Sequence, residues 1–168
     1  MGKSTLFNRL VEERQAIVDD VSGVTRDRNY GEVQWNGEIF TVIDTGGYVP
    51  ESEDVFEAAI REQVHIALDE ADLVLFVVDV TSGVTPLDTS FANMVRRLPH
   101  KTLLVANKVD NSSRRNDMYD FYELGLGEMY PISAINGSGT GELLDALVEK
   151  LPEEKKSEED EDIPRFAI

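Results

Sequence analysis

The sequence contains no cysteine among its 168 residues. This absence excludes disulfide bonds and zinc sites built from thiolates. It suits a reducing compartment, so we expect a cytoplasmic protein. Histidine is scarce as well: His65 and His100 are far apart, and neither has other ligand types at metal-site spacing. We therefore interpret both as structural or surface residues rather than metal ligands.

The sequence also has no long apolar segment and few basic residues. No apolar segment approaches the roughly 18 residues that cross a bilayer, and no secretory signal pattern is present, so we expect no membrane partner. The 16 Lys and Arg against 33 Asp and Glu give a net charge of -17. Such a surface repels nucleic acid at long range. We expect no direct nucleic-acid binding by this domain and interpret the pairs Arg96-Arg97 and Arg114-Arg115 as solvated.

What the sequence does contain is an alternation of strand and helix patterns. We predict strands over 30–35, 38–44, 72–80, 101–110 and 128–133, and helices over 6–11, 53–70, 87–98, 114–124 and 140–151. Asn36-Gly37 predicts a tight hairpin turn between the first two strands. The runs over 72–80 and 101–110 are continuously apolar, which is typical of strands buried on both faces of a parallel sheet. The pattern predicts a doubly wound α/β domain.

The first motif is Gly2-Lys3-Ser4-Thr5, followed by a predicted helix. In a phosphate-binding loop the lysine reaches the β- and γ-phosphates, the serine ligates Mg²⁺, and the N–H groups at the helix start hold phosphate oxygens. We assign all four residues to nucleotide binding, and Ser4 to the metal. The tripeptide alone also occurs by chance. The strand and glycine that normally precede it are absent, so we expect a chain that begins inside its own site.

The second motif is Asp44-Thr45-Gly46-Gly47, directly after a predicted strand. Asp44 is expected to hold Mg²⁺ through water, and the Gly47 N–H to contact the γ-phosphate. Thr25, in the polar loop 19–28, is expected to sense the γ-phosphate and Mg²⁺. We take Lys3, Thr25 and Gly47 as the catalytic set. Taken singly, two glycines also fit a plain tight turn, and Thr25 an ordinary loop threonine.

The third motif, Asn107-Lys108-Val109-Asp110, ends a buried strand and is the most informative. An aspartate carboxylate can accept two hydrogen bonds from N1–H and N2–H₂ of guanine, and adenine offers no such pair of donors. We expect Asp110 to read the base, Asn107 to brace the loops, and the Lys108 stem to lie along the base. In isolation the same tetrapeptide is also a plausible polar loop.

A fourth, weaker signal is Ser133-Ala134, which follows the last predicted strand. It would place the Ala134 N–H at guanine O6, although the dipeptide alone carries little information. A chance occurrence of all four motifs in this order is implausible, because each of the last three lies at the end of a predicted strand. Ligands of such sheets bind at the carboxyl ends of the strands.

These motifs together resemble a known family. The segments GKSTLFNRL, GVTRDRNYGEVQWNG, FTVIDTGGY and LLVANKVD are similar to the first GTP-binding domain of the bacterial double-GTPase ribosome-assembly proteins of the Der (EngA) family, within the Ras-like superfamily. The resemblance covers nearly the whole chain. It implies a three-layer P-loop fold with a mostly parallel central sheet, GTP hydrolysis to GDP and phosphate, GTP or GDP with Mg²⁺ as cofactors, and a role in large-subunit maturation.

The resemblance has further implications for partners and ions. It implies a second GTPase domain, a KH-like domain and the large ribosomal subunit as partners of the full-length protein. Tyr48 stands where many Ras-like GTPases have a catalytic glutamine. Relatives without that glutamine hydrolyse slowly or use K⁺, and the asparagine that holds K⁺ belongs to the absent half of the phosphate loop. K⁺ is therefore an expectation for the full-length protein only.

The resemblance also divides the chain. Residues 1–151 are expected to form the GTP-binding domain without its first strand, 152–162 an acidic linker, and 163–168 the start of the first strand of a second GTPase domain. We predict that the tail Arg165-Phe166-Ala167-Ile168 fills the gap in the sheet, in the same molecule or in a neighbour. About 10 linker residues reach up to about 33 Å when extended.

Two classes of function remain open at this point. The first is a GTPase that switches a partner. The second is a folded interaction module that binds nucleotide weakly, because half of the phosphate loop is absent. Co-purification or titration of a guanine nucleotide would separate the two.

Overall fold

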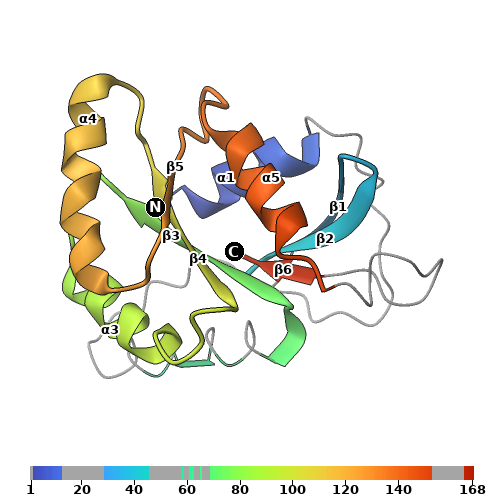
Figure 1. The fold of residues 1–168 in the computed structure, drawn as a ribbon, viewed down its shortest axis with the longest axis horizontal. Helices are drawn as coiled ribbons and strands as arrows, with labels where there is room; N and C mark the ends of the chain where they lie inside the picture. The colour runs from blue at the N-terminus through green and yellow to red at the C-terminus, as the bar shows by residue number, and fades with distance from the viewer. Residues whose placement is uncertain are drawn as a thin grey trace.

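The computed structural model describes residues 2–12, 29–45, 58, 61, 62, 65, 69–152 and 165–168. Within them the chain forms a six-stranded sheet with helices on both faces (Figure 1). The strands are β1 (Asn29–Trp35), β2 (Glu38–Asp44), β3 (Leu73–Asp79), β4 (Thr102–Asn107), β5 (Met129–Pro131) and β6 (Arg165–Ala167). Their spatial order is β1-β2-β6-β3-β4-β5. Only β1 and β2 pair antiparallel, so the predicted mostly parallel α/β sheet is confirmed.

The two central strands are buried because apolar layers cover both sheet faces. All of β4 is buried, and so is all of β3 except Asp79. One apolar cluster joins the sheet to α1 (Lys3–Glu12) and α5 (Thr140–Glu149), and it includes Leu10 and Leu147. A second cluster joins the other face to α3 (Pro86–Val95) and the 3₁₀ helix η1 (Met118–Leu124), and it includes Phe121. The three-layer arrangement is therefore confirmed.

The C-terminal strand β6 lies in the middle of the sheet, as predicted, and in the same molecule. It pairs in parallel with β2 on one side and with β3 on the other. Phe166 has no exposed surface, and its ring meets that of Phe40 edge-on at a centroid distance of 4.7 Å. The backbone continues this pairing, since the Ile168 N–H donates to the Ile43 carbonyl at 2.9 Å. Main-chain pairing and apolar burial therefore both hold the tail in place.

The predicted hairpin is confirmed, and its turn is tied to a helix. Asn36 and Gly37 have φ values of 51° and 85°, the positive angles that a tight hairpin turn requires. The Trp35 indole N–H donates to Asp145 Oδ1 of α5 at 2.7 Å, and the Asn36 amide donates to the same oxygen at 3.1 Å. The half-buried Trp35 thus joins the hairpin to α5 through a hydrogen bond as well as through packing.

Several predicted helix bounds need correction, and local capping explains two of them. The helix expected over 87–98 runs from Pro86 to Val95 because Thr85 and Asp88 form a capping box in front of it. The helix expected over 114–124 is instead α4 (Ser112–Asp117) followed by η1, since Asn111 caps α4 earlier in the chain. Of the helix expected over 53–70, only residues 58, 61, 62, 65, 69 and 70 are described, and all are helical.

A glycine at the start of α5 provides a stability test. Gly139 has a φ of 76°, and a Cβ built on it would lie 2.2 Å from the Pro131 carbonyl oxygen. We expect Gly139→Ala to lower the free energy of unfolding by about 3 kcal/mol, because a left-handed alanine costs about 1–2 kcal/mol and the backbone clash a similar amount. Gly127→Ala is the matched control, since Gly127 has a φ of 83° and open space around it. Equal losses in urea unfolding of the two variants would contradict this account.

Candidate functional site

The first half of the candidate site lies where α1 begins beside the end of β2. Ser4, in the first turn of α1, donates its hydroxyl to Asp44 Oδ2 at 3.1 Å. Asp44 is the last residue of β2 and is 2% exposed. Burial lowers the pKa of the Lys3 ammonium, and the negative charge of Asp44 opposes this shift. The structure thus brings Lys3 and Ser4 close to Asp44, which lies 40 residues after Ser4 in the chain.

The oxygen atoms of Ser4 and Asp44 fit Mg²⁺ as ligands. A serine hydroxyl and a carboxylate in hydrogen-bond contact are hard oxygen donors, which Mg²⁺ prefers, and Mg²⁺ commonly takes its other ligands from phosphate and water. Among the described residues, no group of three or more His, Cys, Asp or Glu side chains could hold a metal. Ser4 and Asp44 offer two protein oxygens, and phosphate and water could supply the remaining ligands of a bound Mg²⁺.

Asn107, the last residue of β4, connects the phosphate side of the site to the base side. It is 2% exposed, and its Oδ1 accepts the N–H groups of Lys108 at 2.8 Å and of Ala134 at 3.0 Å. Its Nδ2 lies so close to Gly2 that a Cβ at Gly2 would be 2.5 Å from it. Asn107 therefore links the end of its own strand to the Ala134 loop and to Gly2, and its bracing role stays a prediction.

The predicted base-reading carboxylate, Asp110, has partners on both oxygens. The buried Ser133 donates its hydroxyl to Oδ1 at 2.5 Å, and Arg114 Nη1 donates to Oδ2 at 2.8 Å. Asp110 itself is about one-third exposed. The carboxylate is thus held on both oxygens while it stays partly exposed to solvent.

Lys108 forms an ion pair with Asp79, an acidic residue that the sequence motifs did not assign to the site. Its Nζ is 2.5 Å from Oδ2 of Asp79, the last residue of β3. Burial alone would raise the pKa of Asp79, but hydrogen bonds from Lys108 and Thr81 and the charge of Lys108 outweigh it, so the pKa lies below its usual value. The signal for Asp79 was available, since it ends a buried apolar run just as Asp44 and Asn107 do.

Two arginines also contact the base-side loops. Arg9 of α1 donates from Nε to the Ala134 carbonyl at 2.9 Å and from Nη2 to the Ile135 carbonyl. Arg114 pairs with Asp110. Away from these loops, Arg96 donates to the carbonyl of Leu124, the last residue of η1, at 2.8 Å. The prediction that both basic pairs are merely solvated is therefore wrong for one member of each. No sequence signal marked Arg9, because its two partners lie 125 and 126 residues further along the chain.

The remaining predicted site residues divide into three cases. Thr25, Gly47 and Tyr48 lie outside the described residues, so their roles stay predictions. Thr5 is exposed in the first turn of α1. The Ala134 N–H, which we expected at guanine O6, donates to Asn107 Oδ1 in this structure, so contact with a base would require it to share or exchange that partner.

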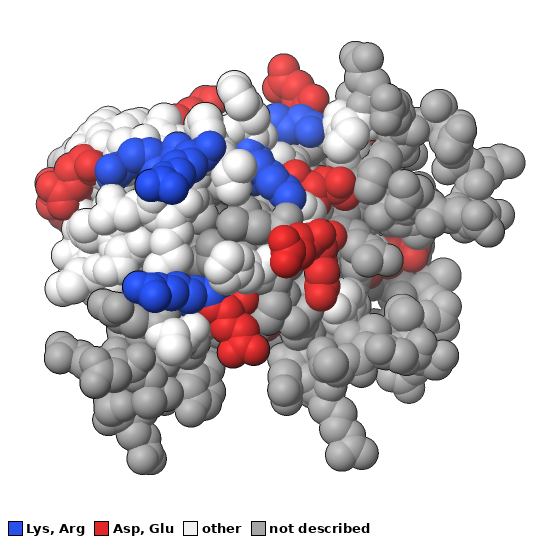
Figure 2. All heavy atoms as spheres, turned by 90° about the horizontal axis from the view of Figure 1, so that it is seen from below, with Lys and Arg blue, Asp and Glu red and all other residues white. Residues whose placement is uncertain are grey.

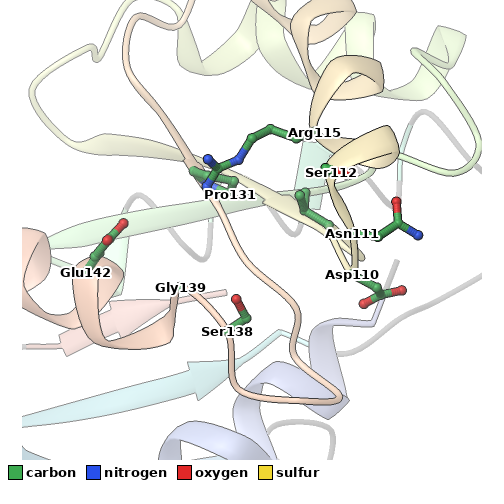
Figure 3. Close-up of a pocket in the computed structure, with 9 residues that line it drawn as sticks. Asp110, Asn111, Ser112, Arg115, Pro131, Ser138, Gly139 and Glu142 are labelled. Carbon is green, nitrogen blue, oxygen red and sulfur yellow. The ribbon is translucent and has the colours of Figure 1, made fainter.

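A cavity of about 330 Å³ lies next to the base-side loops, between α4, β5 and the start of α5 (Figure 3). Its lining includes Asp110, Arg115, Pro131, Ser138 and Glu142. Arg115 extends over Pro131, away from the Asp110 carboxylate (Figure 3). Arg114 and Arg115 are neighbours in the chain, but they therefore face different surroundings.

The face of the molecule shown in Figure 2 carries mixed charge. In Figure 2, blue Lys and Arg atoms lie between red Asp and Glu atoms and form no continuous basic area on the described part of this face. His65 and His100 are exposed, in agreement with their interpretation as surface residues. None of the helices among the described residues is long and apolar enough to cross a membrane.

These features define the P-loop GTPase class of fold. The helix α1 begins within Gly-Lys-Ser, and the loops that carry the other motifs follow β2, β4 and β5 of the mostly parallel sheet. The family model for 50S ribosome-binding GTPases matches residues 1–108, and the chain belongs to that family.

Curated relatives narrow the similarity. The chain is 57% identical to GTPase Der of Flavobacterium johnsoniae over 169 residues, which is 100% of this chain and 39% of that protein. It is 58% identical to GTPase Der of Christiangramia forsetii over 168 residues, or 100% of this chain and 38% of that protein. The resemblance to the first GTPase domain of Der is confirmed. The chain spans less than two-fifths of the length of these relatives.

Solved structures support the fold alone. Nucleolar GTP-binding protein 1 from Plasmodium falciparum aligns with a TM-score of 0.55 and 17% identity, over 89% of this chain and 79% of that one. Translation elongation factor SelB from Methanococcus maripaludis aligns with a TM-score of 0.54 and 20% identity, over 96% of this chain and 34% of that one.

Proposed function

We propose that this chain binds GTP and GDP and hydrolyses GTP to GDP and phosphate. The observation that carries the proposal is the orientation of Asp110 by Ser133 and Arg114. A carboxylate fixed in this way can accept both N1–H and N2–H₂ of guanine. Adenine lacks this pair of donors and would leave part of the carboxylate unsatisfied, so the site selects guanine.

We assign phosphate and metal binding to the start of α1 and the end of β2, where Lys3, Ser4 and Asp44 lie close together. Lys3 would reach the β- and γ-phosphates, and backbone N–H groups of Gly2, Lys3, Ser4 and Thr5 would hold phosphate oxygens. Ser4 would ligate Mg²⁺ directly and Asp44 would hold it through water, and the ion would supply positive charge against the charge that develops on the phosphates. From the sequence, we assign contact with the γ-phosphate to Thr25 and Gly47. The contact between Ser4 and Asp44 supports the metal assignment.

For the full-length protein, we propose a cytoplasmic GTPase that acts in maturation of the large ribosomal subunit. The description of the family as 50S ribosome-binding GTPases supports this role. A second GTPase domain, a KH-like domain and the large subunit are the partners we propose, with K⁺ as a further cofactor of the full-length protein. The charge of -17 favours RNA contact through parts other than this domain.

Calorimetric titration of the purified chain tests the binding proposal. With Mg²⁺ present, we expect GDP to bind at micromolar or tighter affinity and ADP not to bind at the same concentrations. EDTA is expected to weaken GTP binding more than GDP binding, because the γ-phosphate supplies one of the metal ligands. No GDP binding by a chain with a folded circular-dichroism spectrum would contradict the proposal and favour the folded interaction module instead.

A further inference from the structure

Arg114 holds the carboxylate that reads the base, although the guanine motif itself ends at Asp110. Its Nη1 is 2.8 Å from Asp110 Oδ2 and 3.3 Å from the Lys108 carbonyl oxygen. The Arg114 guanidinium therefore contacts both Lys108, the first residue after β4, and the Asp110 carboxylate. These two contacts bridge the turn on which Asp110 lies.

The backbone of Arg114 is fixed in turn by the cap of α4. The Arg114 N–H donates to Asn111 Oδ1 at 3.0 Å, at the start of the helix. Arg114 follows Asp110 by four residues, the spacing at which side chains meet along a helical turn. The guanidinium thus reaches the carboxylate from a short and well-defined piece of chain.

We propose that Arg114 is a positioning residue that sets the preference of the site for guanine over purines without a 2-amino group. This inference rests on the proposed function. Each carboxylate oxygen can accept more than one hydrogen bond. With Arg114 on Oδ2 and Ser133 on Oδ1, both oxygens keep acceptor capacity in a fixed plane for N1–H and N2–H₂ of guanine.

Without Arg114, Ser133 is the one described residue whose side chain still holds the carboxylate, on a single oxygen. The carboxylate can then rotate about the bond between Cβ and Cγ and still accept a single N–H. Hypoxanthine keeps N1–H but has no 2-amino group, so it gains less than guanine from a carboxylate fixed in two positions. Loss of Arg114 should therefore weaken guanine binding more than hypoxanthine binding.

A purely structural role predicts a different result. An exposed ion pair at this spacing contributes little to stability, and Arg114 and Asp110 side chains are 38% and 36% exposed. If the pair only supports α4, its removal changes the affinities for GDP and inosine diphosphate by the same factor. The ratio of the GDP affinity to the inosine diphosphate affinity therefore separates a positioning role from a role in supporting α4. Under either role, we expect loss of the Arg114 side chain to leave the melting temperature unchanged.

The experiment compares Arg114→Gln with Arg115→Gln. Arg115 is the adjacent arginine of the same helix and points over Pro131, away from the Asp110 carboxylate (Figure 3). GDP and inosine diphosphate are titrated calorimetrically into both variants and into the unchanged chain, with Mg²⁺. For Arg114→Gln we expect about a tenfold loss of GDP affinity, since one charged hydrogen bond is of this order, and a smaller loss for inosine diphosphate.

For Arg115→Gln we expect the ratio of GDP affinity to inosine diphosphate affinity to stay unchanged. For Arg114→Lys, which keeps a positively charged hydrogen-bond donor, we expect partial recovery of the GDP preference. Ser133→Ala, which frees the other oxygen, should also reduce the ratio. If the unchanged chain binds GDP in preference to inosine diphosphate and Arg114→Gln keeps that ratio, this inference is overturned while the proposed function stands. If the unchanged chain binds neither nucleotide, both are overturned.

Discussion

A chain without residues 163–168 is expected to lose its cooperative thermal unfolding transition. The reason is the place of β6 between β2 and β3, in the middle of the sheet. Its removal leaves two neighbouring strands without their main-chain partners and exposes the apolar layer around Phe40 and Leu73, which is buried in the intact domain. Buried main-chain groups without partners are costly, and a central gap cannot be hydrated without opening the core.

A milder variant makes this prediction quantitative. Phe166 is fully buried and packs edge-on against Phe40. Phe166→Ala is expected to lower the free energy of unfolding by about 3–5 kcal/mol, a large part of the roughly 5–15 kcal/mol available to a domain. Ile39→Ala is the control, because Ile39 lies on the neighbouring strand β2 but is 43% exposed.

Thermal melts followed by circular dichroism measure these effects. We expect the shortened chain to show no sharp transition, Phe166→Ala a large decrease in melting temperature, and Ile39→Ala almost none. A shortened chain that melts at the same temperature as the unchanged one would show that β6 adds nothing to the stability of the sheet.

Asp110→Asn is expected to replace guanine with xanthine as the preferred base. The carboxylate can accept from both N1–H and N2–H₂ of guanine, whereas an amide offers one acceptor and one donor. An amide therefore matches xanthine, which has N1–H and a carbonyl at the 2 position. Because the variant forms one hydrogen bond fewer with guanine and sets its amide N–H₂ against the base amino group, GDP affinity should decrease about 10²- to 10³-fold.

Titrations of this variant with GDP and xanthosine diphosphate measure the exchange. The variant should bind xanthosine diphosphate more tightly than GDP, and the unchanged chain should show the opposite order. Asn111→Asp is a matched control one residue further on, because Asn111 caps α4 and does not contact the Asp110 carboxylate in the described hydrogen bonds. Equal loss of both nucleotides by Asp110→Asn would argue against base reading by this residue.

Local patterns along the sequence predicted most of the elements, and they also suggested a chemistry for the site. Continuous apolar runs predicted β3 and β4, because strands covered on both faces need no polar alternation. Asn36-Gly37 predicted the hairpin, since both residues tolerate positive φ. Asn107 and Asp110 were assigned to the base side from their position at the end of a buried strand. Helix ends were less accurate, because caps such as Asn111 shift them by a few residues.

Only the tertiary structure decided which distant groups meet. The sequence suggested that the tail could enter the sheet, but the pairing of β6 with β2 and β3 depends on packing that no local pattern encodes. The contacts of Arg9 with the Ala134 loop, of Lys108 with Asp79 and of Trp35 with Asp145 join segments far apart in the chain. Residue type and spacing therefore determined what chemistry is available. The fold decided which of these side chains meet, because contacts between distant segments exist only once the shared core has formed.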